Sequence, residues 1–381
     1  MLALIFLLVA CAFTTVYITQ PVLPILQTEF GITPSLASLS VSVVILGMAI
    51  TTLPIGMLSD RYPVRQLILV GGCVVAGASI VCATTDNFAT LVAMRLIQGS
   101  FIPALTTCTA AWLSRTLPPN ALNVAMGTYV AATVAGGLGG RLLGGWIHPP
   151  LHWRYAFVSA GVTLLVVTLL VTWRLKDSPP LASARGVSVG ALRLVVRRSQ
   201  VLSQIAGFGA FGAFSTAFNY FPFYLSEPPW GLSTGTITSL YLVYVAGLFM
   251  GPFAGKLSNR IGNGAVMVAG ALLLAVALLF TVIVAIPVLI VSLIGLCAGF
   301  FAIHASAIGA LNRSLSGDRG KANALYTLFY YVGGAVGIAV GGDLYSRFGW
   351  PGVLAVSLSM SLLPLAAGVV QWTDRIRAVS S

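Results

Sequence analysis

Charged side chains are scarce in this sequence of 381 residues. Only 7% of the residues are Asp, Glu, Lys or Arg, whereas an ordinary soluble domain contains about 25%. Hydrophobic residues make up 58% of the chain, and the mean hydropathy is +0.98. This composition excludes an ordinary soluble protein. Apolar runs of about 20 residues can cross a hydrocarbon core of about 30 Å, so we predict a membrane protein.

Acidic residues are the rarer charged type, with 8 Asp and Glu against 20 Lys and Arg. We expect none of them in the middle of an apolar run. Four lie at the ends that we place outside and four at the cytoplasmic ends: Glu29, Asp86, Glu227 and Asp343, then Asp60, Asp177, Asp318 and Asp374. Without a carboxylate at mid-membrane, cationic substrates are less favoured than neutral or anionic ones.

Other signals are also missing. The five cysteines lie within apolar runs without metal-ligand spacing, so we expect neither disulfides nor a metal site. No nucleotide-binding signature is present, so we expect no ATP-driven pumping and no cofactor. No loop is long enough for a soluble signalling domain, which disfavours a non-transporting receptor or scaffold. These absences also give no reason to expect an enzyme.

Long apolar runs fill the chain, and their lack of polar alternation excludes a membrane β-barrel. We therefore predict an all-α membrane protein. Its twelve transmembrane helices are expected at residues 3–26, 36–58, 66–84, 88–113, 121–147, 153–173, 200–226, 233–255, 264–284, 287–311, 321–345 and 351–371.

The cations follow this alternation of spans. With the N-terminus in the cytoplasm, the inner segments hold 16 of the 20 Lys and Arg residues, while Arg154 and Arg347 fall outside and Arg95 and Arg141 fall within spans. Cytoplasmic loops of membrane proteins carry such an excess. We predict that both termini are cytoplasmic, and the same distribution excludes nucleic acid as the partner.

The chain repeats itself at about half its length. GMLSDRYPVRQ begins at Gly56, and GKLSNRIG begins 199 residues later at Gly255. Further matches at nearly the same offset pair Arg115 with Arg313, Gly136-Gly137 with Gly333-Gly334, Gly144-Gly145 with Gly341-Gly342, and Trp153 with Trp350. We predict two pseudo-symmetric six-helix bundles, residues 1–173 and 200–381, joined by a polar cytoplasmic linker at 174–199.

Three motifs give this repeat a family resemblance. They are Gly56, Leu58, Asp60, Arg61 and Arg65; Arg95, Gln98 and Gly99; and Gly127, Gly136, Gly140, Gly144 and Gly145. Together they resemble the major facilitator superfamily, and more narrowly its twelve-span drug and metabolite efflux branch, over essentially the whole chain. Two residues depart from the family pattern: Pro63 stands where a glycine is usual, and Arg141 stands where the third motif has a proline.

The resemblance implies roles for these residues. The glycine face of the fifth span would meet the eighth span across the two halves, where Gly247 and Gly251 suit a close contact. Arg95 would take part in proton coupling. Asp60 would form a conformational latch, either by accepting hydrogen bonds from helix N-terminal amides or by pairing with arginines of the other half. The predicted latch comprises Gly56, Asp60, Arg61, Arg65, Gly255 and Arg260, and it is asymmetric because Asn259 replaces the acid in the second copy.

Ionisable residues within spans are costly and therefore informative. His304 titrates near neutral pH, and two interpretations stay open for it, a proton carrier and a satisfied core histidine. Arg141 either binds an anionic substrate group or pairs with Asp343 or Glu29 as a periplasmic latch. The polar outer half of the first span and the aromatic seventh span, which lines the cavity in this branch, give the predicted substrate-cavity residues: Tyr17, Gln20, Arg141, Phe214, Phe218, Asn219 and Tyr220.

These features favour a secondary transporter of the bacterial inner membrane that works by alternating access. We expect it to export a small organic compound against proton entry, as a monomer whose partners are its substrate and membrane lipids. A uniporter or importer of a sugar-like or carboxylate metabolite remains the alternative.

Overall fold

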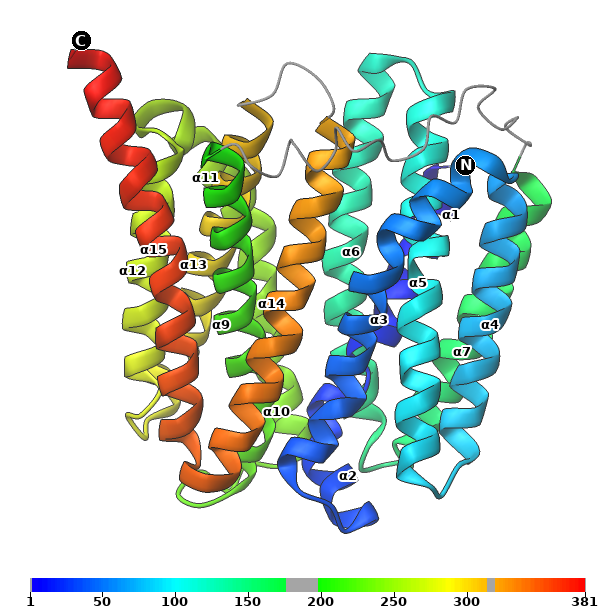
Figure 1. Cartoon of the computed structure of the whole chain (residues 1–381). Helices are drawn as coiled ribbons and strands as arrows, with labels where there is room; N and C mark the ends of the chain where they lie inside the picture. The colour runs from blue at the N-terminus through cyan, green and yellow to red at the C-terminus, as the bar shows by residue number, and fades with distance from the viewer. Residues whose placement is uncertain (1, 176–197, 314–318, 381) are drawn as a thin grey trace. The chain divides into compact units, whose positions relative to one another are not determined.

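The computed structural model describes residues 2–175, 198–313 and 319–380, and within them every regular element is helical (Figure 1). The first half contains α1 (Leu2–Tyr17), η1 (Gln20–Val22), α2 (Leu23–Phe30), α3 (Pro34–Arg61), α4 (Val64–Thr84), α5 (Phe88–Thr116), α6 (Pro119–Ile147) and α7 (Arg154–Arg174). The second contains α9 (Arg198–Ser226), α10 (Thr234–Leu240), η2 (Tyr241–Tyr244), α11 (Val245–Ile261), α12 (Asn263–Phe280), α13 (Ile286–Arg313), α14 (Arg319–Phe348) and α15 (Trp350–Ser380).

Eleven helices or broken helices among the described residues are long and apolar enough to cross a membrane. The remaining long helix is the glycine-rich α6, with 29 residues. Together they account for the twelve expected spans, and the prediction of an all-α membrane protein is confirmed.

The chain forms two compact units. Among the described residues, unit 1 comprises those within 1–186 and 233–241, and unit 2 comprises those within 187–232 and 242–381. The segment 233–241, which contains α10 and begins the eighth span, therefore groups with unit 1. Most of the expected linker at 174–199 lies outside the described residues.

Each unit is a bundle of packed helices. In unit 1, α1 packs on α6 and α7, α3 packs on α5, and α4 packs on α5 and α7. In unit 2, α9 packs on α14 and α15, α12 packs on α13 and α15, and α11 packs on α13. The α1–α6 and α9–α14 pairs occupy corresponding places in the sequence repeat.

The first span is broken at Pro21. Pro21 has no amide hydrogen to donate to the residue four positions earlier, and its ring disfavours a continued helix. The helix α1 accordingly ends at Tyr17, the 3-10 turn η1 contains Pro21, and α2 resumes at Leu23. The break exposes the last carbonyl groups of α1 to new hydrogen-bond partners.

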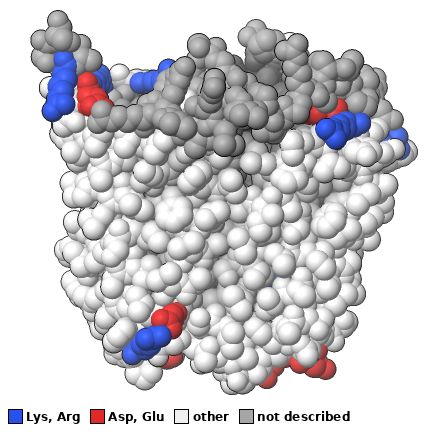
Figure 2. Space-filling view, in the orientation of Figure 1, with Lys and Arg blue, Asp and Glu red and all other residues white. Residues whose placement is uncertain are grey.

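Apart from Arg95 and Arg141, the charged side chains of the described residues lie near the ends of the helices. On the face drawn in Figure 2, the surface between the two ends is white, as expected for a lipid-facing surface. In unit 1, Arg61 and Arg115 lie in the last turns of α3 and α5, and in unit 2, Arg260 and Arg313 lie in the last turns of α11 and α13. The alternation of spans predicted from the cations is thus compatible with the helices observed.

Candidate functional site: a buried polar network in unit 1

The glycines of α6 bring it against α1. A Cβ atom added at Gly136, Gly140 or Gly144 would overlap the backbone oxygen of Ala10, Thr14 or Ile18, respectively. These residues recur every four positions on both helices, so the two backbones touch along two turns. Small residues allow such close approach between membrane helices.

This packing corrects the expectation that the whole glycine face meets the eighth span. Only Gly145 faces that span, because its added Cβ would overlap the side chain of Thr238 in α10. Gly247, which was expected opposite these glycines, faces Phe301 within unit 2, and the expected contact between the two halves stays a prediction. Gly127, the first glycine of the motif, has open space beside it.

Unit 2 repeats the arrangement. An added Cβ at Gly333 would overlap the Phe208 backbone, and one at Gly337 would lie 2.6 Å from the Gly212 oxygen. Thus α14 lies on α9 as α6 lies on α1. The shared packing explains why the glycine pairs recur in the sequence.

Arg95 forms hydrogen bonds with the end of α1, at the break in the first span. It is fully buried in α5, and its guanidinium donates to the carbonyl oxygens of Thr15 at 2.6 Å and Val16 at 2.5 Å. Its Nε donates to the Ser40 oxygen of α3 at 2.7 Å. The two α1 carbonyls belong to the last turn of that helix, so the cation also lies at the negative end of the helix dipole.

Gln98 extends this network to α4. Its Oε1 accepts from Arg95 Nη1 at 2.8 Å, and its Nε2 donates to Ser79 Oγ at 2.7 Å. Arg95 therefore has several neutral acceptors for its charge. These bonds connect α1, α3, α4 and α5 through a single buried side chain and its neighbour.

A second buried arginine lies on α6 beside the broken span. Arg141 is 3% exposed, and its Nε donates to Gln20 Oε1 at 2.6 Å while Nη1 donates to the Gly137 oxygen at 2.7 Å. Its guanidinium carbon lies 3.9 Å from the ring centroid of Tyr17 and 5.5 Å from that of Tyr241. We call Tyr17, Gln20, Arg141 and Tyr241 the Arg141 cluster.

The acids expected as partners for Arg141 have other bonds. Glu29 accepts from Trp153 Nε1 at 2.5 Å and from Arg154 at 2.9 Å, and Asp343 pairs with Arg347 at 3.0 Å. The bonds described above for Arg141 go to Gln20 and Gly137. Both predicted roles of Arg141, anion binding and a periplasmic latch, stay predictions.

The Glu29 carboxylate ties α2 to the start of α7. Arg154 bridges Glu29 and Asp86, at 2.9 Å from each, and donates to the Thr85 oxygen at 2.8 Å. Near this group, burial and then the charge of His152 lower the pKa of His148, while Glu29 acts in the opposite direction. These bonds stabilise the end of unit 1 that lies opposite Asp60.

Asp60 pairs within its own unit. Its Oδ1 lies 2.5 Å from Arg115 Nη2, and Arg115 Nη1 donates to the Ser59 oxygen at 2.9 Å. The sequence did not predict this partner, and the two expected ones, the helix N-terminal amides and the arginines of the other half, stay predictions for another conformation. In unit 2, Arg313 donates to Asn259 Oδ1 in the corresponding place.

The other predicted latch residues lie around these two pairs. Gly56 is in α3 and Gly255 in α11, while Arg61, Arg65 and Arg260 are exposed. Nothing in a single structure tests whether they change partners, so the latch stays a prediction.

The aromatic residues of α9 are packed inside unit 2. Phe214 stacks on Phe300 with centroids 4.1 Å apart, and Phe218 contacts Tyr244 edge-on at 4.8 Å. Tyr220 donates to the Ile338 oxygen at 2.8 Å. Asn219 is also fully buried. These contacts are those of core residues, and a role for the four in lining a substrate cavity stays a prediction.

His304 lies in α13 beside the same aromatic cluster. Its Nδ1 is 2.9 Å from the Tyr326 hydroxyl, and its ring centroid is 4.9 Å from that of Tyr330. A hydrogen-bonded histidine among aromatic rings fits both interpretations that the sequence left open.

The family sequence model described as the Major Facilitator Superfamily matches residues 5–250 and 230–377. The chain belongs to the major facilitator superfamily. Among its relatives, the uncharacterized MFS-type transporter YybF of Bacillus subtilis is 29% identical, over 93% of this chain and 88% of that protein. The inner membrane transport protein YnfM of Escherichia coli is also 29% identical, over 93% and 86% of the two chains.

Solved structures agree at the level of the fold. The crystal structure of a bacterial homolog to the human lysosomal transporter Spinster, in an inward-facing and occupied conformation, has a TM-score of 0.79 at 15% identity. The match covers 99% of this chain and 96% of that one. The family match and the two relatives identify this chain as a multi-pass membrane transporter of the superfamily.

Some contacts of the candidate site were not predicted from the sequence of this superfamily member. Arg115 was recognised as a repeated residue but not as the partner of Asp60, although Arg313 and Asn259 lie at almost the same spacing. Tyr241 could not be assigned to Arg141, because more than 90 residues separate them in sequence. The pair between Arg154 and Glu29 had one signal in the sequence, since Arg154 is one of two arginines expected on the outer side of the membrane.

Proposed function

We propose that this transporter exports small organic compounds, neutral or anionic, in exchange for protons across the bacterial inner membrane. Both termini would be cytoplasmic, at the side rich in Lys and Arg. The relative named as an inner membrane transport protein supports this location. The Arg141 cluster is the observation that carries the preference for substrate charge.

The chemistry of the Arg141 cluster favours a carboxylate or a similar anion. A guanidinium has five donors in a planar fork that suits two oxygen atoms. In the cluster, the guanidinium lies beside the Tyr17 and Tyr241 rings and donates to the Gln20 amide oxygen. An anion that reached Arg141 would add an ionic contribution to its hydrogen bonds. Neutral compounds would use the aromatic rings and Gln20 without that gain.

Proton coupling in this proposal uses His304. Arginine does not release its proton under physiological conditions, so Arg95 would support the cycle by holding the broken first span. Histidine can exchange a proton near neutral pH. The Tyr326 hydroxyl at 2.9 Å gives His304 a neighbour that can donate or accept during such an exchange.

Proton flux in inverted vesicles tests this function. Vesicles with an imposed inside-acid gradient would receive chloramphenicol as a neutral probe, benzoate as an anion and ethidium as a cation. We expect benzoate or chloramphenicol, and not ethidium, to dissipate the gradient. The Arg141→Gln variant should weaken the benzoate response about tenfold, the effect of losing one charged hydrogen bond, and change the chloramphenicol response little.

An Arg174→Gln variant provides the control, because Arg174 is exposed at the end of α7. Equal loss for benzoate and chloramphenicol in Arg141→Gln would contradict selective anion binding. Accumulation of either probe without proton movement would favour the uniporter or importer instead.

We further propose that the Asp60–Arg115 pair forms and breaks during transport. The Asp60→Asn variant copies Asn259, which already accepts a hydrogen bond from Arg313, so the variant should remain folded. Its hydrogen bond to Arg115 lacks the ionic contribution, and we expect the balance between conformations to shift about tenfold. Probe-driven proton flux, normalised to protein in the vesicles, measures the effect. Wild-type flux in Asp60→Asn would show that this pair is no latch.

A further inference from the structure

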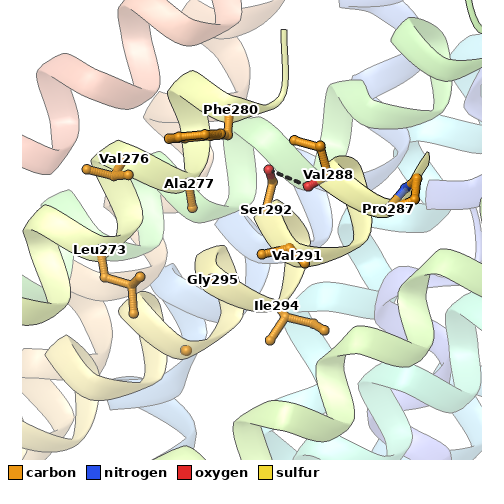
Figure 3. A pocket seen from close by; sticks show the side chains of 11 residues that line it. Leu273, Val276, Ala277, Phe280, Pro287, Val288, Val291, Ser292, Ile294 and Gly295 are labelled. Atoms are coloured by element: carbon orange, nitrogen blue, oxygen red, sulfur yellow. Dashed lines mark hydrogen bonds between the residues drawn. The ribbon is translucent and has the colours of Figure 1, made fainter. Parts of the chain in front are cut away.

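An apolar groove runs between α12 and α13 on unit 2. Its volume is about 610 Å³. In Figure 3, Phe280, Val276 and Leu273 project from one helix and Val291 and Ile294 from the other, while Gly295 leaves room between them. The walls are open to the surroundings, since Val291 is 67% exposed and Phe280 49%.

The groove offers no polar group to a ligand at this depth. Ser292 has the only polar side chain among the lining residues, and its Oγ donates to the Val288 oxygen at 2.8 Å (Figure 3). Ser292 as a whole is 3% exposed, and its hydroxyl faces its own helix. The lining therefore fits a hydrocarbon and offers no hydrogen-bonding or ionic side chain to a polar substrate.

The groove has the length of one leaflet. Its α13 side runs from Pro287 to Ala298, which is about 16 Å at 1.5 Å per residue. Half of a hydrocarbon core of about 30 Å is about 15 Å. On α12 it covers Leu273 to Phe280, the half of the helix next to the loop at 281–285. A ligand in the groove would thus extend from the loop end of these helices to mid-membrane.

We propose that this groove binds one acyl chain of a bilayer phospholipid. The chain has the required apolar character and length, and hydrocarbon is the solvent of a membrane-spanning helix at this depth. Laid between α12 and α13, it contacts both walls and gains dispersion contacts that a flat lipid-facing surface does not provide. The orientation proposed above places the site in the leaflet opposite the cytoplasm. No side chain of the groove selects the headgroup.

Photo-crosslinking of lipid tails tests this site. The full-length protein would be reconstituted in phosphatidylcholine vesicles containing a small fraction of phosphatidylcholine with a diazirine on one tail, and labelled peptides would be mapped by mass spectrometry. We expect labelling of residues 273–298 to exceed that of exposed α7 positions such as Val166 and Leu170 by about threefold or more, a modest binding preference over bulk lipid.

Two tryptophan variants make the test specific. Val291→Trp places an indole in the groove and should lower its labelling to the level of α7. Ile290→Trp adds the same side chain at the neighbouring exposed position, outside the lining, and should leave labelling unchanged. Uniform labelling of α7 and the groove, or equal loss in both variants, would overturn the proposal. A groove protected from lipid in a dimeric protein would overturn it in favour of a second copy. None of these outcomes depends on transport.

Discussion

Replacing Gly140 by valine is expected to separate α1 from α6 and to prevent most of the protein from folding. An added Cβ at Gly140 overlaps the Thr14 backbone oxygen, which cannot move without moving α1. Overpacking in a core costs about 1–3 kcal/mol and sometimes more, and a backbone clash puts this site at the upper end, about 3 kcal/mol. The measurement is the melting temperature and yield of monodisperse protein in detergent.

Gly127→Val is the matched control on the same helix. An added Cβ at Gly127 has no neighbour within 4 Å, so we expect its stability to change by about 0.5 kcal/mol or less, as for ordinary surface substitutions. The two glycines belong to one sequence motif, and only the structure distinguishes them. Gly140→Val could instead have the same melting temperature as Gly127→Val and fail to transport. In that case the glycine face would serve conformational change more than folding.

Arg95→Ala is expected to destabilise unit 1 and to abolish transport. The substitution leaves the carbonyl groups of Thr15, Val16 and Ser40 without the donor they have here. Hydrogen bonds to a charged group contribute about 1.5–3 kcal/mol each in soluble proteins, but polar contacts in membranes average nearer 0.6 kcal/mol. We therefore expect a loss of about 2–4 kcal/mol in the free energy of unfolding, measured by thermal unfolding in detergent.

Arg95→Lys separates charge from geometry. A lysine keeps the positive charge, but its single ammonium cannot reach the three carbonyls in the manner of the planar guanidinium, so its stability should fall between wild type and Arg95→Ala. Arg174→Ala is the control, because that side chain is exposed at a helix end. An Arg95→Ala protein that melts like wild type and does not transport would instead support the coupling role that the family resemblance implies.

The helices and their repeat followed from local properties of the sequence. Apolar length identifies a span because each residue adds a fixed rise along the helix, and Pro21 marks the break in the first span because it lacks an amide hydrogen. The glycine pairs recurred because both units use them for the same close packing. The two arginines within spans were also recognised from local properties of the sequence. A cation within a span is costly whichever way its side chain points.

Partners were much harder to predict than positions. No partner for Arg95 was evident from the sequence, and the broken end of α1 supplies carbonyl oxygens that accept from it. A sequence cannot show that these carbonyls lie beside α5, because Thr15 and Arg95 are 80 residues apart. The same reason explains why Arg115 was not predicted as a partner of Asp60 and why α1 was not predicted beside Gly140.

The sequence by itself determined that the protein lies in a membrane, that it is all-helical, that it contains an internal repeat and which family it belongs to. These properties follow from hydropathy, helix rise and motif spacing, which act over short distances along the chain. Only the tertiary structure decided which buried groups meet. It assigned Arg95 to the carbonyls of α1, Arg115 to Asp60, and three glycines of α6 to α1. Each of these contacts depends on helix packing angles and rotations, which local composition does not specify.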